Sequence, residues 1–430
     1  MANALPGAQQ EIRPHSHRIA PSATMPSPGC QAHIMTDSPK RGFARRASQL
    51  TPFKVVDFLD AAMARQAAGE DIIRMEVGEP IFSLPAPMAA AAHHAQSNTH
   101  QGYTSSLGMP ALRQAIAHFY AQRYGIDLDP ARVIVTTGSS AALGMVCDLL
   151  LNPGDSLLLT DPGYPCNANF VHRCDATLVR IPVVAENHYQ PSPEDIQRHW
   201  RNDTAGLLVA SPGNPTGDML SRSALTALHG AVTQHGGTLI VDEIYHGLSY
   251  DEASEVSVLE LTDDAFVINS FSKYFAMSGW RLGWLVAPEE ALDPLRLMTQ
   301  NFHISPPSLA QHVALAAFEP ECIALFEARR AELRARRDFL VPALRELGLR
   351  IPHPPPGAFY IYAGIETLAD DCEAFCWDML ARAGVSITPG TDFGHFQAHN
   401  HVRFSYTAEP LPRLEQAVER LAKVLARREI

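Results

Sequence analysis

The sequence predicts an α/β fold in which a mostly parallel sheet of seven strands lies between layers of helices. Seven short apolar runs recur at the spacing expected of alternating strands and helices. Most lack the polar alternation of a strand with one face in water, so both faces of the sheet should be covered by helices. The runs are Val133–Thr136, Ser156–Leu159, Thr177–Ile181, Leu207–Ala210, Thr238–Val241, Phe266–Ile268 and Leu282–Val286.

Composition limits the class of protein. The chain has 430 residues, of which 46% are hydrophobic and 19% charged, so it is long enough for more than one core-bearing unit. Its formal net charge of -12 opposes the binding of a polyanion, and we expect no nucleic-acid partner. No apolar stretch reaches the length of a membrane span, so we expect no membrane insertion.

The cysteines and histidines favour a reducing compartment and no metal. The seven cysteines form no C-x-x-C pair and are odd in number, so neither a disulfide framework nor a zinc site is expected. The closest histidines, His93 with His94 and His399 with His401, lack the spacing of a ligand group. We therefore expect a cytoplasmic protein without a metal site.

Residues 1–45 are predicted to be a disordered leader. They are rich in Pro, Ser and Ala and show no hydrophobic period, so they cannot bury enough apolar surface to fold. They also lack the continuous apolar segment of a secretory signal. The arginines at 41, 45 and 46 leave an organelle transit peptide open, and Met35 is an alternative start.

The rest of the chain is predicted to form two domains. Apolar residues from Phe53 onward indicate a helix through Ala61–Ala68, followed by a strand at residues 72–77. After Glu319 a long charged helix and several short strands indicate a smaller α+β domain. The predicted divisions are an N-terminal segment at 46–84 that joins the small domain, a large domain at 85–325 and a small domain at 326–430.

One lysine has the surroundings of a nucleophile. Lys273 directly follows an apolar run and the serines Ser270 and Ser272, and Arg281 comes eight residues later. A partly desolvated amine near other cations can form a Schiff base with an aldehyde. Serine hydroxyls and a guanidinium can hold a phosphate. The pattern favours an aldehyde cofactor with a phosphate tail, and the alternative is a solvated loop lysine with an ordinary ion-pair arginine.

Polar residues follow the predicted strands where ligands of parallel sheets bind. Gly138, Ser139 and Ser140 open a helix, so free amides and the positive helix end could hold a phosphate, although such a sequence is also a common helix entry. Asp242 directly follows a buried run, so a carboxylate there is not expected to be a solvated surface cap and could pair with a cationic group of a ligand. If such a cation lay about 4 Å from the Asp242 carboxylate, the attraction between the two charges would stabilise the charged forms by roughly 4 kcal/mol at an effective dielectric near 20.

The lysine string Asn269–Trp284, the N-P-T-G at Asn214–Gly217 and the D-E-I-Y at Asp242–Tyr245 occur in an order that resembles the class I/II aminotransferases. These are pyridoxal-phosphate (PLP) enzymes of fold type I, and the resemblance covers roughly residues 50–425. It implies PLP as the cofactor, an α-amino acid and a 2-oxo acid as substrates, and a homodimer with shared active sites.

The resemblance also implies a role for individual residues. Lys273 would form the Schiff base and move the proton between the substrate and the cofactor. Arg403, which by itself could equally have an internal carboxylate partner, would bind the substrate α-carboxylate, and Gly78 would allow close approach of the substrate. The implied cofactor-binding residues are Gly138, Ser139, Ser140, Tyr164, Asn214, Asp242, Tyr245, Ser270, Ser272, Arg281 and, from the neighbouring subunit, Tyr103.

Two other functions remain open. A PLP-dependent lyase or synthase of the same fold would use the same residues. A catalytically idle regulator is less favoured, because the lysine is retained and no appended DNA-binding helix pair is found. No Lys or Arg occurs between Arg296 and Arg329, where dicarboxylate-specific members can supply a second arginine, so a site for aspartate or glutamate alone is disfavoured.

Overall fold

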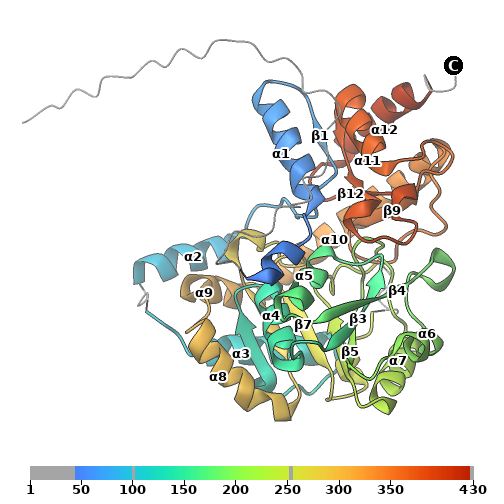
Figure 1. The fold of residues 1–430 in the computed structure, drawn as a ribbon. Helices are drawn as coiled ribbons and strands as arrows, with labels where there is room; N and C mark the ends of the chain where they lie inside the picture. The colour runs from blue at the N-terminus through green and yellow to red at the C-terminus, as the bar shows by residue number, and fades with distance from the viewer. Residues whose placement is uncertain (1–43, 99–101, 251–254, 427–430) are drawn as a thin grey trace, which may run out of the picture. The chain divides into compact units, whose positions relative to one another are not determined.

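The computed structural model describes residues 44–98, 102–250 and 255–426 (Figure 1). The chain divides into two units, residues 1–48 and 49–430. In the first unit the described residues enter a short 3-10 helix, η1 (Arg45–Gln49). The predicted leader, its transit-peptide alternative and Met35 lie almost wholly outside the described residues.

The second unit is built on a seven-stranded sheet with the order β2-β8-β7-β6-β5-β3-β4. Neighbours from β7 to β4 are parallel, whereas β8 is antiparallel to both β2 and β7. The predicted mostly parallel sheet is confirmed. Its strands are β2 (Val133–Thr136), β3 (Ser156–Asp161), β4 (Thr177–Pro182), β5 (Thr204–Ala210), β6 (Thr238–Asp242), β7 (Phe266–Ser270) and β8 (Gly283–Val286).

Helices cover both faces of this sheet, as the bare apolar runs predict. Alternate residues of a strand point to opposite faces, so Val267 joins one core cluster and Ile268 the other. The helices that contribute to the first cluster include α3 (Pro110–Tyr124), α7 (Arg222–Gln234), α9 (Ser308–Ala316) and α10 (Pro320–Glu346). Those in the second are α4 (Ser139–Leu150), α5 (Pro165–Arg173) and α8 (Leu292–Phe302).

The C-terminal part of the chain forms a smaller antiparallel sheet with the order β11-β12-β9. A two-stranded parallel sheet joins β1 to β10, so the N-terminal segment pairs with the C-terminal part. Figure 1 shows α1 beside these C-terminal elements. The elements are α1 (Lys54–Ala67), β1 (Ile73–Arg74), β9 (Tyr360–Gly364), α11 (Cys372–Asp378), β10 (Val385–Ser386), β11 (Thr388–Pro389), β12 (His401–Ser405) and α12 (Leu411–Leu425).

Some predicted elements are shorter than expected. The strand predicted at residues 72–77 has only two residues, because its partner β10 is equally short. Helix α11 changes after Asp378 into the π-helix η8 (Met379–Ala383), which ends at Gly384 with φ of 63°. The predicted domain boundaries at residues 84 and 325 stay a prediction.

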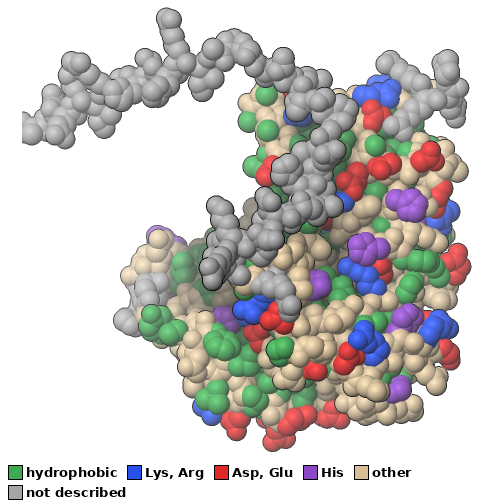
Figure 2. Space-filling view, in the orientation of Figure 1, with side chains coloured by type: hydrophobic (Ala, Val, Ile, Leu, Met, Phe, Trp, Pro, Cys, Tyr) green, Lys and Arg blue, Asp and Glu red, His purple; other side chains and the backbone are tan. Residues whose placement is uncertain are grey.

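The remaining elements are helices α2 (Ala86–Asn98) and α6 (Pro193–His199) and short 3-10 turns. Those turns are η2 (Pro130–Arg132), η3 (Ala185–Asn187), η5 (Val258–Glu260), η6 (Ser278–Trp280), η7 (Glu289–Ala291), η9 (Gly390–Asp392) and η10 (Ala398–Asn400). Over the described ranges, no single helix has both the length and the apolar character to cross a membrane, and only the pair α9 and α10, bent by 83°, meets that test together. Figure 2 shows acidic and basic side chains interspersed over the face in view.

Two glycines, one in the large sheet and one in a helix that covers it, test the packing of this unit. A Cβ at Gly206 in β5 would lie 2.2 Å from the backbone oxygen of Thr238 in β6, whereas a Cβ at Gly230 in α7 would meet nothing within 4 Å. We expect Gly206→Ala to lower the free energy of unfolding by about 2 kcal/mol or more, because the strands must separate. Gly230→Ala should raise it by about 1 kcal/mol. Urea unfolding measures both, and an unchanged stability in Gly206→Ala would contradict the strand packing.

Candidate active site

A cavity of about 240 Å³ lies at the carboxyl ends of β5, β6 and β7. Ligands of parallel sheets bind at this edge. The cavity brings together most of the residues singled out in the sequence: Gly78, Ser139, Ser140, Tyr164, Asn214, Asp242, Tyr245, Ser272, Lys273, Arg281 and Arg403. Gly138, Ser270 and Tyr103 are not part of this lining, and 84% of the surface of Tyr103 is exposed.

Lys273 enters the cavity just after β7. Its Nζ donates a hydrogen bond of 2.6 Å to the backbone oxygen of Gly78 and lies 5.7 Å from the ring centroids of Tyr245 and Phe359. Burial and then the positive charge of Arg403 lower the pKa of Lys273 to about 8. A larger fraction of this amine is therefore neutral near pH 7 than in an exposed lysine.

Asp242 ends β6 on the floor of the cavity, and only 5% of its surface is exposed. One carboxylate oxygen accepts a 3.1 Å hydrogen bond from the backbone N–H of Ile244. Burial raises the pKa of Asp242 to about 7, although that hydrogen bond lowers it. A cationic group bound beside Asp242 would restore its charged form.

Two tyrosines form the wall between Lys273 and the smaller sheet. The hydroxyl of Tyr245 lies 2.9 Å from that of Tyr360, which is on β9. A Cβ at Gly78 would lie 1.8 Å from the Tyr360 hydroxyl, so the backbone at residue 78 must lack a side chain. The sequence reasoning did not include Tyr360 among the site residues.

Arg403 on β12 faces the cavity from the smaller sheet and is 3% exposed. Its Nη1 donates a 2.9 Å hydrogen bond to Asn214 Oδ1, and its Nη2 donates to the backbone oxygen of Glu76. The guanidinium also lies 4.4 Å from the ring centroid of Tyr360. No acidic side chain in the described ranges lies within ion-pair distance of Arg403, although the positive charge of Arg403 acts to lower the pKa of the buried Asp392. The alternative of an internal carboxylate partner is therefore met only by this longer-range interaction.

The opposite end of the cavity is suited to an anion. Gly138 has φ of 77° and precedes α4, so the first amides of that helix have no partner within it. A Cβ at Gly138 would lie 2.8 Å from Arg281 Nη2, which brings the guanidinium against the helix entry. Ser139 and Ser272 also line this end. A helix N-terminus, hydroxyls and a guanidinium are the groups that bind phosphate.

Ser270 supports this arrangement from behind. Its hydroxyl lies 2.8 Å from the hydroxyl of Ser272 and 3.0 Å from the backbone oxygen of Leu282, and it accepts from the Ser272 amide at 3.1 Å. The structure therefore places Ser272 in the cavity lining and Ser270 one layer deeper.

An apolar wall comes from the start of α1, which the sequence reasoning did not assign to the site. Phe53, Val55, Val56 and Leu59 line the cavity, together with Val77. Helix α1 is held there by a residue far along the chain: the carboxylate of Asp392 accepts from the amide of Lys54 at 2.6 Å. This contact spans 338 residues, so no local pattern could have indicated it.

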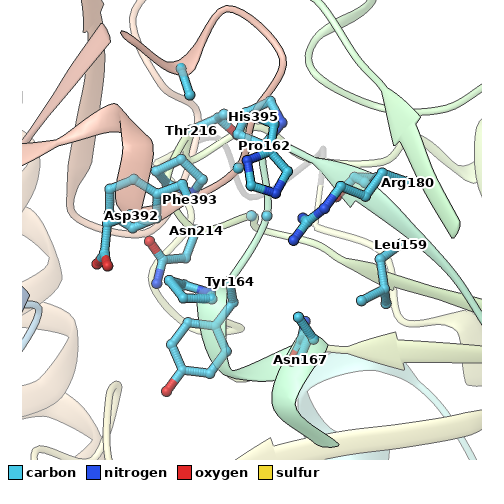
Figure 3. A pocket seen from close by; sticks show the side chains of 18 of the residues that line it. Leu159, Pro162, Tyr164, Asn167, Arg180, Asn214, Thr216, Asp392, Phe393 and His395 are labelled. Carbon is cyan, nitrogen blue, oxygen red and sulfur yellow. The ribbon is translucent and has the colours of Figure 1, made fainter. Parts of the chain in front are cut away.

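A second cavity, of about 410 Å³, adjoins the first (Figure 3). The two share Tyr164, Ala210 and Asn214. Figure 3 shows Tyr164 and Asn214 on one side of this second cavity and Arg180 reaching toward it from the opposite side. Tyr164 thus stands between the two cavities with its ring available to both.

Comparison with known proteins identifies the family. Residues 70–421 match the family described as aminotransferase class I and II. The chain belongs to this family.

Several relatives cover nearly the whole chain. It is 38% identical to a valine–pyruvate aminotransferase of Mycobacterium tuberculosis over 87% of this chain and 96% of that protein. It is 32% identical to an aspartate/prephenate aminotransferase of Thermus thermophilus over 90% of this chain and 100% of that protein. Among solved structures, an aminotransferase from M. tuberculosis has a TM-score of 0.86 at 37% identity, covering 90% of this chain and 99% of that one.

The family uses pyridoxal phosphate, and the chain is a PLP-dependent aminotransferase. The residues present fit this cofactor. The buried carboxylate of Asp242 would be held in its charged form by a cation, and a protonated pyridine nitrogen would supply one. The phosphate fits the cationic end at Ser139, Ser272 and Arg281, and the amine of Lys273 belongs to the lining of the same cavity.

The raised pKa of Asp242 predicts how the stability of the cofactor-free protein depends on pH. Folding favours the protonated acid, so this contribution is present below the unfolded value of 3.8 and is lost as the pH rises to about 7. As the pH rises from 3.8 to about 7, we expect Asp242→Asn to become more stable relative to the natural protein. Above pH 7 the difference in stability between the two proteins should stay constant. Melting temperatures between pH 4 and 8 measure the effect, and parallel curves would contradict the raised pKa.

Proposed function

We propose that Lys273 is the residue that bonds to the cofactor aldehyde and then carries the proton of the reaction. The observation that supports this most is the single cavity that combines the Lys273 amine, whose pKa burial lowers to about 8, with a buried carboxylate and an arginine. A neutral amine is both a nucleophile and a general base, and a pKa near the working pH suits each role.

When bound, PLP supplies an aldehyde that reacts with amines and a protonated ring that accepts electrons. Asp242 would hold the proton on the ring nitrogen. Asn214 and Tyr245 would donate hydrogen bonds to the ring oxygen, and Tyr164 would lie against the ring face. The phosphate would bind to Ser139, Ser140, Ser272 and Arg281, with Gly138 opening the helix entry and Ser270 holding Ser272 from the layer beneath.

Arg403 would bind the α-carboxylate of the substrate. It is buried, points into the cavity and has only neutral hydrogen-bond partners among the described residues. Its planar fork can grip a carboxylate through two hydrogen bonds. Lys273, which lines the same cavity, would then take the proton from the substrate Cα, and the backbone of Gly78, whose oxygen accepts from Lys273, would border the substrate.

We propose further that the amino donor carries an apolar side chain. The wall formed by Phe53, Val55, Val56, Leu59 and Val77 offers no charged group to a second carboxylate. Burying an apolar side chain there removes it from water, which contributes about 0.8 kcal/mol for each CH₂ group. The valine–pyruvate activity named for the M. tuberculosis relative agrees with this proposal.

The proposed active unit is a cytoplasmic homodimer. Tyr103 is 84% exposed and lies away from the cavity of its own chain, which fits a role at the phosphate of a neighbouring subunit. Other large apolar side chains are exposed as well, among them Ile81, Leu297, Phe302 and Ile304. Exposed apolar groups of this kind are commonly covered when subunits associate.

A single half-reaction tests the assignment of Lys273 and the donor class. Enzyme loaded with cofactor is mixed with one amino acid and no 2-oxo acid, across apolar, aromatic and acidic donors. We expect conversion of the cofactor to its amine form to stop after one turnover and to resume when pyruvate is added. Valine and leucine should react at least about tenfold faster than aspartate, because three CH₂ equivalents give more than 1.4 kcal/mol.

Lys273→Ala should bind the cofactor but fail to complete this half-reaction at a measurable rate. Lys423→Ala, which removes an exposed lysine on α12, is the matched control and should react normally. Continuous release of ammonia or an unsaturated product without pyruvate would favour the lyase or synthase instead. A preference for aspartate would overturn the proposed donor class.

Mixed dimers test the sharing of sites. In a heterodimer of Tyr103→Ala and Lys273→Ala subunits, one site carries both changes and the other carries neither. Random mixing of two inactive variants should therefore restore about a quarter of the natural activity. No recovery on mixing, or a fully active monomer in analytical ultracentrifugation, would contradict the shared site.

A further inference from the structure

A cluster of two histidines and one aspartate lies outside the residues assigned to catalysis. Asp218 Oδ1 is 2.7 Å from His353 Nε2 and 3.4 Å from His188 Nδ1. The three potential ligand atoms all lie within 4.8 Å of one another. The residues come from three different segments: His188 follows η3, Asp218 follows the turn that carries Asn214, and His353 lies between α10 and β9.

The cluster combines a rigid carboxylate with accessible imidazoles. The Asp218 side chain is 2% exposed, whereas those of His353 and His188 are 26% and 66% exposed. The backbone of Asp218 is fixed, because its oxygen accepts from the amide of Gly213 at 2.9 Å. A buried carboxylate needs a cationic or hydrogen-bonding partner. Here the partners are His353 and His188, which are themselves partly exposed to solvent.

We propose that His188, Asp218 and His353 bind a divalent transition-metal ion of the Zn²⁺ type. Two imidazole nitrogens and one carboxylate oxygen are a known donor set for zinc, with a water molecule in the fourth position. Tetrahedral bonds of about 2.0–2.1 Å require ligand atoms roughly 3.3 Å apart. The observed separations of 2.7 and 3.4 Å lie on either side of that value. Small rotations of the exposed His188 and the partly exposed His353 can complete the geometry.

The ion would join two parts of the chain that meet at the active site. Asp218 ends the turn that carries Asn214, and the amide of Gly357, near His353, donates to the backbone oxygen of Gly217 at 3.0 Å. Gly357 leads directly into the segment of Phe359 and Tyr360. A metal bridge between Asp218 and His353 would therefore tie the loop before β9 to the Asn214 turn. Binding to the folded state alone stabilises it by mass action.

The sequence reasoning expected no metal site, since it considered only histidines close together in the chain. Here 30 residues separate positions 188 and 218, and 135 separate 218 and 353. Only the fold brings the three side chains together.

Calorimetric titration of the chelator-treated, cofactor-loaded enzyme with ZnCl₂ tests the proposal, with MgCl₂ as the comparison ion. We expect one Zn²⁺ per chain, a higher melting temperature with Zn²⁺ and neither effect with Mg²⁺, which prefers oxygen ligands. His188→Ala and His353→Ala should each weaken Zn²⁺ binding at least about tenfold, because each removes one of three protein ligands. His118→Ala, an exposed histidine on α3, is the matched control and should bind normally.

His188→Ala changes an exposed side chain, and circular dichroism would verify that His188→Ala and His353→Ala are both folded. If His353→Ala proved unfolded, His188→Ala alone would decide the result. Absence of a stoichiometric Zn²⁺ site would overturn the proposal and leave the cluster as a hydrogen-bonded triad. Unchanged affinity in the folded variants, or an equal loss in His118→Ala, would overturn it as well.

Discussion

The buried guanidinium of Arg403 is the contact on which the arrangement of the active site depends. It comes from the smaller sheet and donates to Asn214 Oδ1 at the end of β5 and to the backbone of Glu76 in the N-terminal segment. Three distant parts of the chain therefore meet at one cation. Because a buried charge is unfavourable without partners, each of these parts is held in place, and the guanidinium remains directed at the cavity.

The charged side chains in the cavity lack ion-pair partners of opposite charge among the described residues and are suited to a bound cofactor and substrate. Burial raises the pKa of Asp242 to about 7 and lowers that of Lys273 to about 8, so the neutral form of each is more populated near pH 7 than in an exposed side chain. In the proposed function, a cationic ring nitrogen would return Asp242 to its charged form, and a substrate carboxylate would pair with Arg403. Burying these polar groups without their ligands lowers the stability of the fold, as is common in active sites.

The sequence was sufficient to predict the large sheet, because its strands are bare apolar runs that only a doubly covered sheet can bury. It also placed Lys273, Asp242 and Asn214 together, since residues that follow parallel strands share one edge. It could not predict the wall from α1, which Asp392 holds across 338 residues, nor the role of Tyr360 beside Gly78. The cluster at His188, Asp218 and His353 was missed for the same reason. These features depend on tertiary contacts without a local pattern.

The most direct test of this account is to locate the covalent attachment of the cofactor. Borohydride reduction of the loaded enzyme fixes the cofactor to its amine partner, and peptide mass spectrometry then identifies the modified residue. The account predicts a phosphopyridoxyl group on the peptide that contains Lys273, in a stoichiometry of about one per chain. Modification of another lysine in place of Lys273, or full activity without any attachment, would contradict it.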